Sequence, residues 1–231
     1  MAGLSISSIG AELLDDPSAD PAIVAESLRN IARANRWFGG AAAVRFGLRR
    51  TLAGIPAKTT LTLLDVGTGL GDLPDVAVRW GARRGLRVVP IGLELNRAAA
   101  ALARAQGLCV AVACASAPPL RDKSVDVVLV SQLAHHLTSE SVVQLLRTCD
   151  RIARRAVIVG DLRRHVLAAS SFWIGARLLG FDRVTLHDGV TSIRRGFSRS
   201  ELLGLMRRAR IKGAVHRRPG FRLVATWCPE N

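Results

Sequence analysis

The sequence predicts an α/β protein built on one mostly parallel, seven-stranded sheet with helices on both faces. Short apolar runs alternate with helix-like segments from residue 58 onwards, and this alternation is typical of a parallel sheet. The runs are continuous rather than alternately polar, as expected for strands that are covered on both faces. With 231 residues, 49% of them hydrophobic, the chain is long enough for one sizeable core.

Two helical segments are expected before the sheet begins. Asp20 is a good N-cap residue and Pro21 suits the first position of a helix. The segment 35–40 contains two consecutive glycines and is expected to break the helix before a second, shorter one. We therefore predict an N-terminal helical cap or lid over residues 1–57 and a core over residues 58–231.

The alternation itself predicts five strands and three helices. The strands are expected at residues 61–66, 87–93, 108–113, 125–130 and 156–160. Apolar residues at helical spacing fill the segments between them. The helices are expected near residues 72–84, 96–106 and 139–153.

The pattern changes after the fifth strand, and we expect a helical insertion near residues 162–196. An apolar stretch predicts one long helix over residues 162–179, and the polar segment 187–196 is expected to be a loop. Ser198 and Glu201 have the spacing of a capping box, so a helix should start there. Two strand candidates, joined by a Pro-Gly turn, complete the sheet: residues 212–216 and 221–228.

The turn after the first strand is the strongest candidate for a binding site. Asp65 lies near the end of that strand, and Gly67, Gly69 and Gly71 follow at every second position. Backbone without Cβ atoms can approach a ligand closely, and the helix that follows offers free N–H groups. A dinucleotide site has the spacing G-x-G-x-x-G, so here the third glycine comes one residue early. A nucleoside with an amino-acid tail has no pyrophosphate but carries an ammonium group, which Asp65 could hold.

The segment Asp65-Val-Gly67-Thr-Gly69-Leu-Gly71 resembles the D/E-x-G-x-G-x-G motif of class I S-adenosylmethionine (SAM)-dependent methyltransferases. Glu94 ends the second strand, where the family has an acid that accepts hydrogen bonds from the ribose hydroxyls. The segments 118–130 and 131–137 resemble the family's "LPF…SFDVV" and "LHHL" segments. The resemblance covers residues 58–161. It implies a Rossmann-like fold, SAM as the cofactor and S-adenosylhomocysteine (SAH) as the product.

The resemblance also implies which residues hold the cofactor. They are Asp65, Gly67, Thr68, Gly69, Gly71, Asp72, Glu94, Leu95, Ala115, Ser116 and Ser131. One position departs from the family pattern, because Cys114 stands where an Asp near the adenine amino group is usual. A thiol is a poor acceptor, so adenine recognition would rest on the backbone near Ala115 and Ser116 or on the Ser116 hydroxyl.

Three residues at the carboxyl ends of the fourth and fifth strands are candidates for catalysis. His135 and His136 follow the fourth strand, and either imidazole could act as a general base near neutral pH. His135 is our first choice, and the alternative is that one histidine caps a helix while the other packs. Asp161 would orient a histidine or bind substrate, or else pair with an arginine. No metal site is expected.

The acceptor is expected to lie between the N-terminal helices and the insertion. The candidate lid and acceptor residues are Asn35, Arg36, Trp37, Phe38, Trp173, His187 and Asp188. Ordinary packing is the alternative for Trp37 and Phe38. The apolar insertion suggests a lipophilic or aromatic acceptor. The resemblance points to the small-molecule subgroup that acts in quinone and secondary-metabolite biosynthesis, most often by O-methylation.

The net charge of +15 leaves other partners open. It could serve an RNA-modifying methyltransferase or a membrane surface, or reflect a compositional bias towards arginine. The N-P-P-[YF] motif of base-modifying enzymes is not found after the fourth strand, and aromatic residues make up only 4% of the chain, so a flipped base is not favoured. A non-catalytic SAM-binding partner protein is a further alternative. No signal peptide or transmembrane segment is expected, which predicts a cytoplasmic protein.

Overall fold

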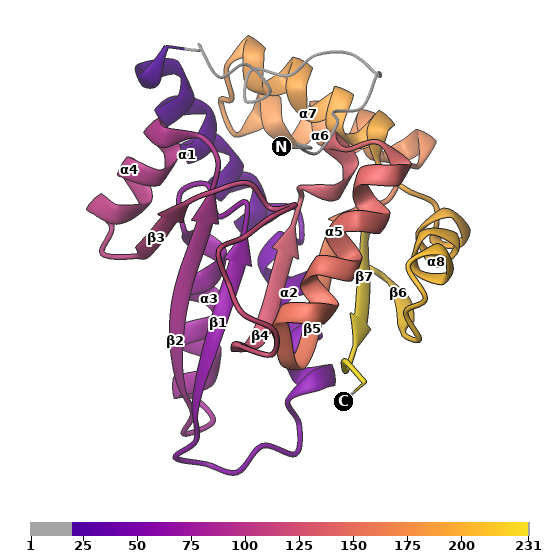
Figure 1. The fold of residues 1–231 in the computed structure, drawn as a ribbon. Helices are drawn as coiled ribbons and strands as arrows, with labels where there is room; N and C mark the ends of the chain where they lie inside the picture. The colour runs from indigo at the N-terminus through magenta and orange to yellow at the C-terminus, as the bar shows by residue number, and fades with distance from the viewer. Residues whose placement is uncertain (1–19, 231) are drawn as a thin grey trace.

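The computed structural model describes residues 20–230, and in it seven strands form one sheet with the order β3-β2-β1-β4-β5-β7-β6 (Figure 1). Strands β1 to β5 are parallel, whereas β7 runs antiparallel to both β5 and β6. The prediction of a mostly parallel Rossmann-like sheet is confirmed. The strands are β1 Thr60–Val66, β2 Arg87–Glu94, β3 Cys109–Val112, β4 Val125–Ser131, β5 Ala153–Leu162, β6 Ala214–Arg218 and β7 Arg222–Trp227.

Helices cover both faces of the sheet, because successive side chains of a strand point to opposite faces. In β1, Leu61 and Leu63 pack with helices α2 and α3, whereas Leu64 and Val66 belong to the core cluster under α5 and α8. This explains why the strands are continuous apolar runs. These four helices are α2 Gly40–Thr51, α3 Asp72–Ala82, α5 Ser139–Ile152 and α8 Arg199–Arg208.

The two N-terminal helices have different surroundings. Helix α1 (Pro21–Trp37), capped by Asp20 as expected, packs through Val24 and Leu28 on α4 (Arg97–Ala105). Helix α2 instead belongs to the main core. The division into a cap over residues 1–57 and a core over residues 58–231 stays a prediction, and residues 1–19 lie outside the described part of the chain.

The insertion differs from the expectation in two respects. The long helix begins later than predicted, at α6 (Val166–Leu178), because Leu162 still belongs to β5 and pairs with Arg222 of β7. The expected loop over residues 187–196 is wrong, since helix α7 spans Arg183–Arg195.

Two features explain why residues 183–195 form a helix and not a loop. Asp182 caps its N-terminus by accepting a hydrogen bond from the backbone of Thr185. Its interior glycine, Gly189, lies against the ring of Phe172 in α6, where an added Cβ would overlap the ring. The glycine therefore permits close packing of two helices and does not mark a loop.

The carboxyl ends of the parallel strands are covered by helices from distant parts of the chain. Figure 1 shows α1, α6 and α7 beyond the ends towards which β1, β2 and β4 point. A short 3-10 helix, Ala134–His136, follows β4 at the same edge. Open parallel sheets bind their ligands at this edge, so the fold places the expected site beneath these helices.

Candidate active site

A cavity of about 1080 Å³ lies at the carboxyl edge of the sheet. It extends from the glycine turn and the end of β2, across the end of β4, to helices α1, α6 and α7. Ligand pockets usually measure about 300–1000 Å³. The cavity therefore has room for a cofactor and a second small molecule.

The glycine turn adopts a backbone that side chains rarely permit. Gly67, Gly69 and Gly71 have φ values of 73°, 53° and 85°. These positive values are accessible to glycine at little energetic cost. The turn carries the chain from β1 into α3, with Gly71 as the N-cap residue of that helix.

Asp65 is buried under the turn with one oxygen unsatisfied. Its Oδ2 atom accepts a hydrogen bond from the Thr68 hydroxyl at 2.9 Å, whereas Oδ1 has no partner among the described residues. Burial, with smaller contributions from the charges of Asp72 and Glu94, raises the pKa of Asp65 to about 8. A cationic group in the cavity would offset this unfavourable burial. The orphaned oxygen therefore fits the ammonium group of a nucleoside that carries an amino-acid tail.

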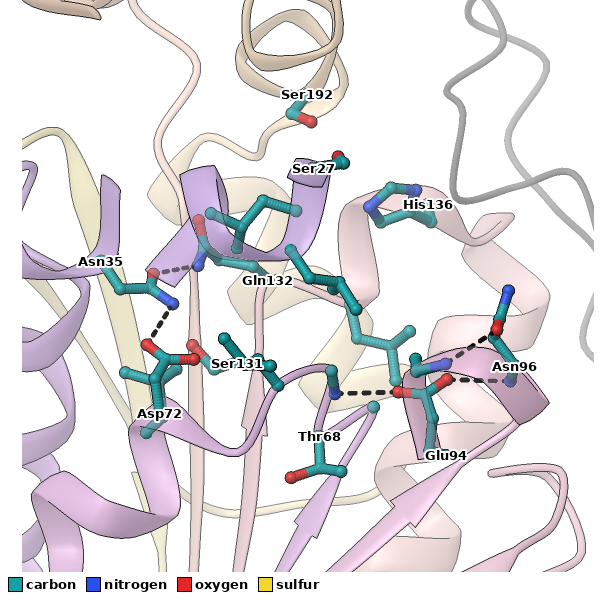
Figure 2. Close-up of a pocket in the computed structure, with 18 of the residues that line it drawn as sticks. Ser27, Asn35, Thr68, Asp72, Glu94, Asn96, Ser131, Gln132, His136 and Ser192 are labelled. Atoms are coloured by element: carbon teal, nitrogen blue, oxygen red, sulfur yellow. Dashed lines mark hydrogen bonds between the residues drawn. The ribbon is translucent and has the colours of Figure 1, made fainter. Parts of the chain in front are cut away.

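Glu94 connects the glycine turn to the end of β2 through hydrogen bonds. Its Oε2 atom accepts a hydrogen bond from the backbone of Gly69 at 2.9 Å, and Oε1 accepts from the backbones of Leu95 and Asn96 (Figure 2). Three backbone donors fix the carboxylate at the cavity wall. A carboxylate has about four acceptor sites, so Oε2 keeps capacity for a hydroxyl of a bound ligand.

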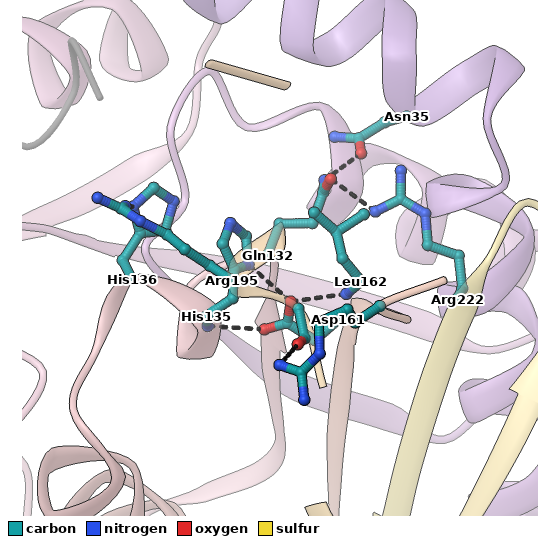
Figure 3. Close-up of polar contacts among 10 residues, drawn as sticks. Asn35, Gln132, His135, His136, Asp161, Leu162, Arg195 and Arg222 are labelled. Carbon is teal, nitrogen blue, oxygen red and sulfur yellow. Dashed lines mark hydrogen bonds and ion pairs between the residues drawn. The ribbon is translucent and has the colours of Figure 1, made fainter. Parts of the chain in front are cut away.

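A chain of polar side chains crosses the cavity wall from α3 to β7. The Asn35 amide donates to Asp72 at 3.0 Å and accepts from Gln132, whose own Oε1 accepts from Arg222 at 2.6 Å (Figures 2 and 3). The Arg222 Nε atom also donates to the carbonyl of Phe38 at 3.0 Å. Helix α1 is thereby connected to the glycine-turn helix, to the end of β4 and to β7.

Of the charged residues at the two ends of this polar chain, Arg222 is buried and Asp72 is half-buried. Burial raises the pKa of Asp72, although the hydrogen bond from Asn35 opposes the shift. Burial lowers the pKa of Arg222 to about 10, and the Asp161 carboxylate opposes that change. Arg222 was not among the predicted site residues. Only the antiparallel pairing of β5 with β7 brings it to the cavity.

His135 and Asp161 form a buried pair at the ends of β4 and β5 (Figure 3). The Nδ1 atom of His135 lies 2.6 Å from Asp161 Oδ1, and the backbone N–H of His135 donates to Oδ2. Burial alone would raise the pKa of Asp161, but the adjacent His135, with smaller contributions from the Leu162 backbone N–H and His136, holds that pKa below its ordinary value. The Nε2 atom of His135 is buried and has no partner among the described residues. Because His135 lines the cavity, Nε2 is the ring nitrogen left for a bound molecule.

His136 also lines the cavity, in a different environment. Its ring lies 4.3 Å from that of His135, and its Nδ1 atom is 3.2 Å from a guanidinium nitrogen of the buried Arg195. A guanidinium is always a donor, so Nδ1 accepts here. The two histidines therefore differ in the partner that sets their tautomer.

Most of the expected cofactor residues line the cavity. These are Asp65, Gly67, Thr68, Gly69, Asp72, Glu94, Leu95, Ala115 and Ser131. Gly71 and Ser116 are not among the lining residues. The Ser116 hydroxyl instead lies 3.1 Å from the thiol of Cys114, which does line the cavity.

The expected lid residues are distributed unevenly around the cavity. Asn35 and Asp188 line it, whereas Arg36, Trp37, Phe38, Trp173 and His187 do not. Trp37 is 63% exposed and lies under the Arg36 guanidinium, and Phe38 packs on the ring of Phe172.

Helices α1 and α7 contribute cavity residues that the sequence interpretation missed. They are Ser27, Leu28, Ile31, Thr185, Ser192 and Ile193. The sequence shows that α1 has an apolar face, but it does not show that this face points towards the cavity. Across residues 20–230 no cluster of His, Cys, Asp or Glu could hold a metal ion.

Comparisons with known proteins agree with this geometry. Residues 64–159 match a family model described as a methyltransferase domain. No curated protein matches the sequence. The plantazolicin methyltransferase BpumL, solved with SAH, has 14% identity and a TM-score of 0.67, over 95% of this chain and 94% of its own.

Two further solved structures have the same fold. A SAM-dependent methyltransferase from Aquifex aeolicus has 17% identity and a TM-score of 0.59, over 91% of this chain and 99% of its own. The magnesium protoporphyrin IX methyltransferase of Synechocystis PCC 6803, with bound SAH, has 10% identity and a TM-score of 0.55, over 84% and 83%.

The chain is an enzyme with a methyltransferase domain over residues 64–159, and its fold is that of SAM-dependent methyltransferases of known structure. Its methyl donor is SAM and its product is SAH. None of the helices described over residues 20–230 is both long and apolar enough to cross a membrane.

Proposed function

We propose that the enzyme methylates an oxygen atom of a small, lipophilic or aromatic acceptor, in quinone or secondary-metabolite biosynthesis. The observation that carries this proposal is the His135–Asp161 pair: His135 lines the cavity, Asp161 lies at its Nδ1, and its Nε2 atom has no partner among the described residues. A hydroxyl must lose its proton as its oxygen takes up a methyl group, and a positioned imidazole can receive that proton. A cytoplasmic location is part of the same proposal and rests on the sequence.

In this proposal His135 is the general base and Asp161 is its positioning residue. Asp161 accepts the Nδ1 proton, so the neutral imidazole keeps its lone pair on Nε2. An unpartnered buried polar atom destabilises a protein by about 1–3 kcal/mol, and a hydroxyl donor from the acceptor would remove that penalty. His136 has its Nδ1 on Arg195 and would contact the acceptor without taking the proton.

The cofactor would occupy the side of the cavity formed by β1, β2 and the glycine turn. SAM supplies a methyl group on a sulfonium, which the acceptor displaces in line. Asp65 would hold the ammonium group, and Glu94 would hold the ribose hydroxyls. Thr68, Ser131 and the backbone around Ala115 would complete this wall.

The acceptor would occupy the opposite side, under α6 and α7. Leu162, Phe172 and Ile193 give this side apolar surface, and Thr185 and Ser192 of α7 add hydroxyl groups to it. Asp188, from α7, lies at the same wall. A flat or lipophilic acceptor suits this apolar surface, because polar groups on an acceptor would find few hydrogen-bond partners there.

The proposal is tested with a panel of phenols and hydroxyquinones, each paired with the same compound blocked as its methyl ether. SAH release is measured with purified enzyme and SAM. We expect release with at least one free hydroxyl compound and none with its blocked partner. Release with both members of every active pair would place the methyl group on carbon or nitrogen. Release only with total RNA would favour the alternative of an RNA-modifying enzyme that uses the basic surface.

A further inference from the structure

Helix α6 exposes large apolar side chains near both of its ends, with the exposed Ser170 and Ser171 between them. The five large apolar side chains are between 47% and 87% exposed. They are Val166, Leu167, Trp173, Ile174 and Leu178. Their spacing places them on one side of the helix. Exposed apolar residues are ordinary when they are scattered singly, but five large ones on one side of a single helix indicate an interaction site.

The opposite side of α6 belongs to the cavity wall. Ala168 and Phe172 pack with Leu162 and Ile193, and Phe172 lines the cavity. A single helix therefore separates the space next to the histidines from the exposed apolar face. Whatever contacts this face lies one helix diameter, about 10 Å, from the acceptor side of the cavity.

The charges around this face are positive. Residues 163–181 contain Arg163, Arg164, His165 and Arg177 and no acidic residue. Arg164 is paired with Glu201, whereas the Arg177 guanidinium lies over the ring of Trp173 at 5.4 Å. An arginine stacked on a tryptophan can remain at a polar boundary while the ring inserts below it.

We propose that α6 is a docking surface for an anionic lipid bilayer. Such a bilayer offers both an apolar interior for the five side chains and negative headgroups for the arginines. Nucleic acid offers the charge but no apolar surface of this kind. A second copy of the chain is disfavoured, because each copy carries a net charge of +15 and would bring arginines against arginines.

Docking in this way would bring the acceptor wall of the cavity to the membrane. A lipophilic acceptor concentrated in the bilayer could then enter beneath α6. This last step rests on the proposed function, whereas the docking itself does not. Vesicle binding requires no acceptor, cofactor or turnover, so a failure of the docking proposal can be told apart from a failure of the proposed function.

The test is flotation of the full-length protein with vesicles. Neutral vesicles contain phosphatidylcholine alone, and anionic vesicles also contain phosphatidylglycerol. We expect binding to the anionic vesicles. Ile174→Glu and Leu178→Glu should each lower the partition coefficient on the order of tenfold or more. Each replaces an aliphatic side chain that would insert into the bilayer with a charged one.

The matched control is Ile23→Glu on α1, where the native side chain is 46% exposed. It should bind vesicles like the native protein, and circular dichroism should show all three variants folded. Brominated lipid should quench tryptophan fluorescence in the native protein and much less in Trp173→Phe. Equal binding by Ile23→Glu and Ile174→Glu, or no binding by the native protein, would overturn the proposal. A native dimer in light scattering that Leu178→Glu converts to a monomer would identify a second copy as the occupant instead.

Discussion

Asp161 holds both the backbone and the ring of His135. Its Oδ1 atom lies 2.6 Å from the ring Nδ1, and its Oδ2 atom lies 3.3 Å from the backbone nitrogen. The Asp161 side chain is fully buried and that of His135 almost so. This relationship fixes the position of the imidazole, whose Nε2 atom has no partner within residues 20–230.

Asp161→Asn should lower turnover without weakening cofactor binding. The amide keeps the shape of the carboxylate but no longer favours the tautomer with its lone pair on Nε2. Loss of a partner that orients a functional histidine typically lowers activity about 10- to 100-fold. Steady-state kinetics with SAM and an active acceptor measure kcat, and calorimetry measures the Kd of SAM. A Kd that rises as steeply as kcat falls would show that Asp161 supports the cofactor site instead.

Asp65 should release a proton when SAM binds. Its pKa of about 8 in the free protein means that the carboxyl is mostly protonated at pH 7. An ammonium beside it favours the carboxylate, so binding displaces close to one proton. Calorimetry at pH 7 in buffers of different ionisation enthalpy counts that proton. Between about pH 6 and pH 7.5 the affinity should rise with pH, by up to tenfold per unit.

Asp65→Asn is the control for this linkage. The variant should release no proton from this site and should bind SAM about 10- to 100-fold more weakly, the usual effect of losing a hydrogen bond to a charged group. Proton release that persists unchanged in the variant would mean that another group titrates on binding.

Without cofactor, Asp65→Asn should become more stable relative to the native protein as the pH rises. A carboxyl whose pKa is raised by folding destabilises the folded state progressively between its unfolded pKa, near 4, and its folded pKa, near 8. The difference in Tm between Asp65→Asn and the native protein should therefore become more positive from acidic to neutral pH. Thermal melts without cofactor at several pH values measure it, and a constant difference would contradict the assignment.

Asn35→Ala should weaken cofactor binding by about tenfold, because Asp72 loses the amide that donates to it and α1 loses its connection to Gln132. The matched control is Asn30→Ala on the same helix. Asn30 donates to Asp182 and Thr185 at the start of α7 and makes no contact with the polar chain. Calorimetry with SAM separates the two variants. Equal weakening would indicate a general loosening of α1.

Gly189→Ala should change the acceptor side of the cavity alone. The added methyl group would overlap the Phe172 ring, which must move because it packs directly on this position. We expect the KM for the acceptor to change severalfold, with the Kd of SAM unaffected. Parallel kinetics and calorimetry measure the two constants. An altered Kd for SAM would mean that the α6–α7 pair also shapes the cofactor side.

The elements that the sequence predicted best are those specified by neighbouring residues. The strand–glycine turn–helix segment at residues 61–72 and the capping box of Ser198 and Glu201 are local patterns, and both are present. The class of enzyme followed from the same segment.

Other parts depend on contacts between distant residues, which a sequence pattern does not display. Leu162 continues β5 because it pairs with Arg222, sixty positions later. Gly189 lies inside a helix because Phe172 packs on it. The exposed positions of Trp37 and Trp173 likewise follow from how α1 and α6 are oriented on the sheet.

The central claim, that His135 removes a proton from an acceptor hydroxyl, is tested most directly by His135→Asn. Its kcat is compared with that of the native enzyme for two phenolic acceptors of similar shape. One has a hydroxyl that ionises well above the assay pH, and the other is already ionised. We predict a loss of about 10²- to 10⁴-fold for the first acceptor and a small loss for the second. Equal losses for both acceptors, or no loss for either, would contradict the claim.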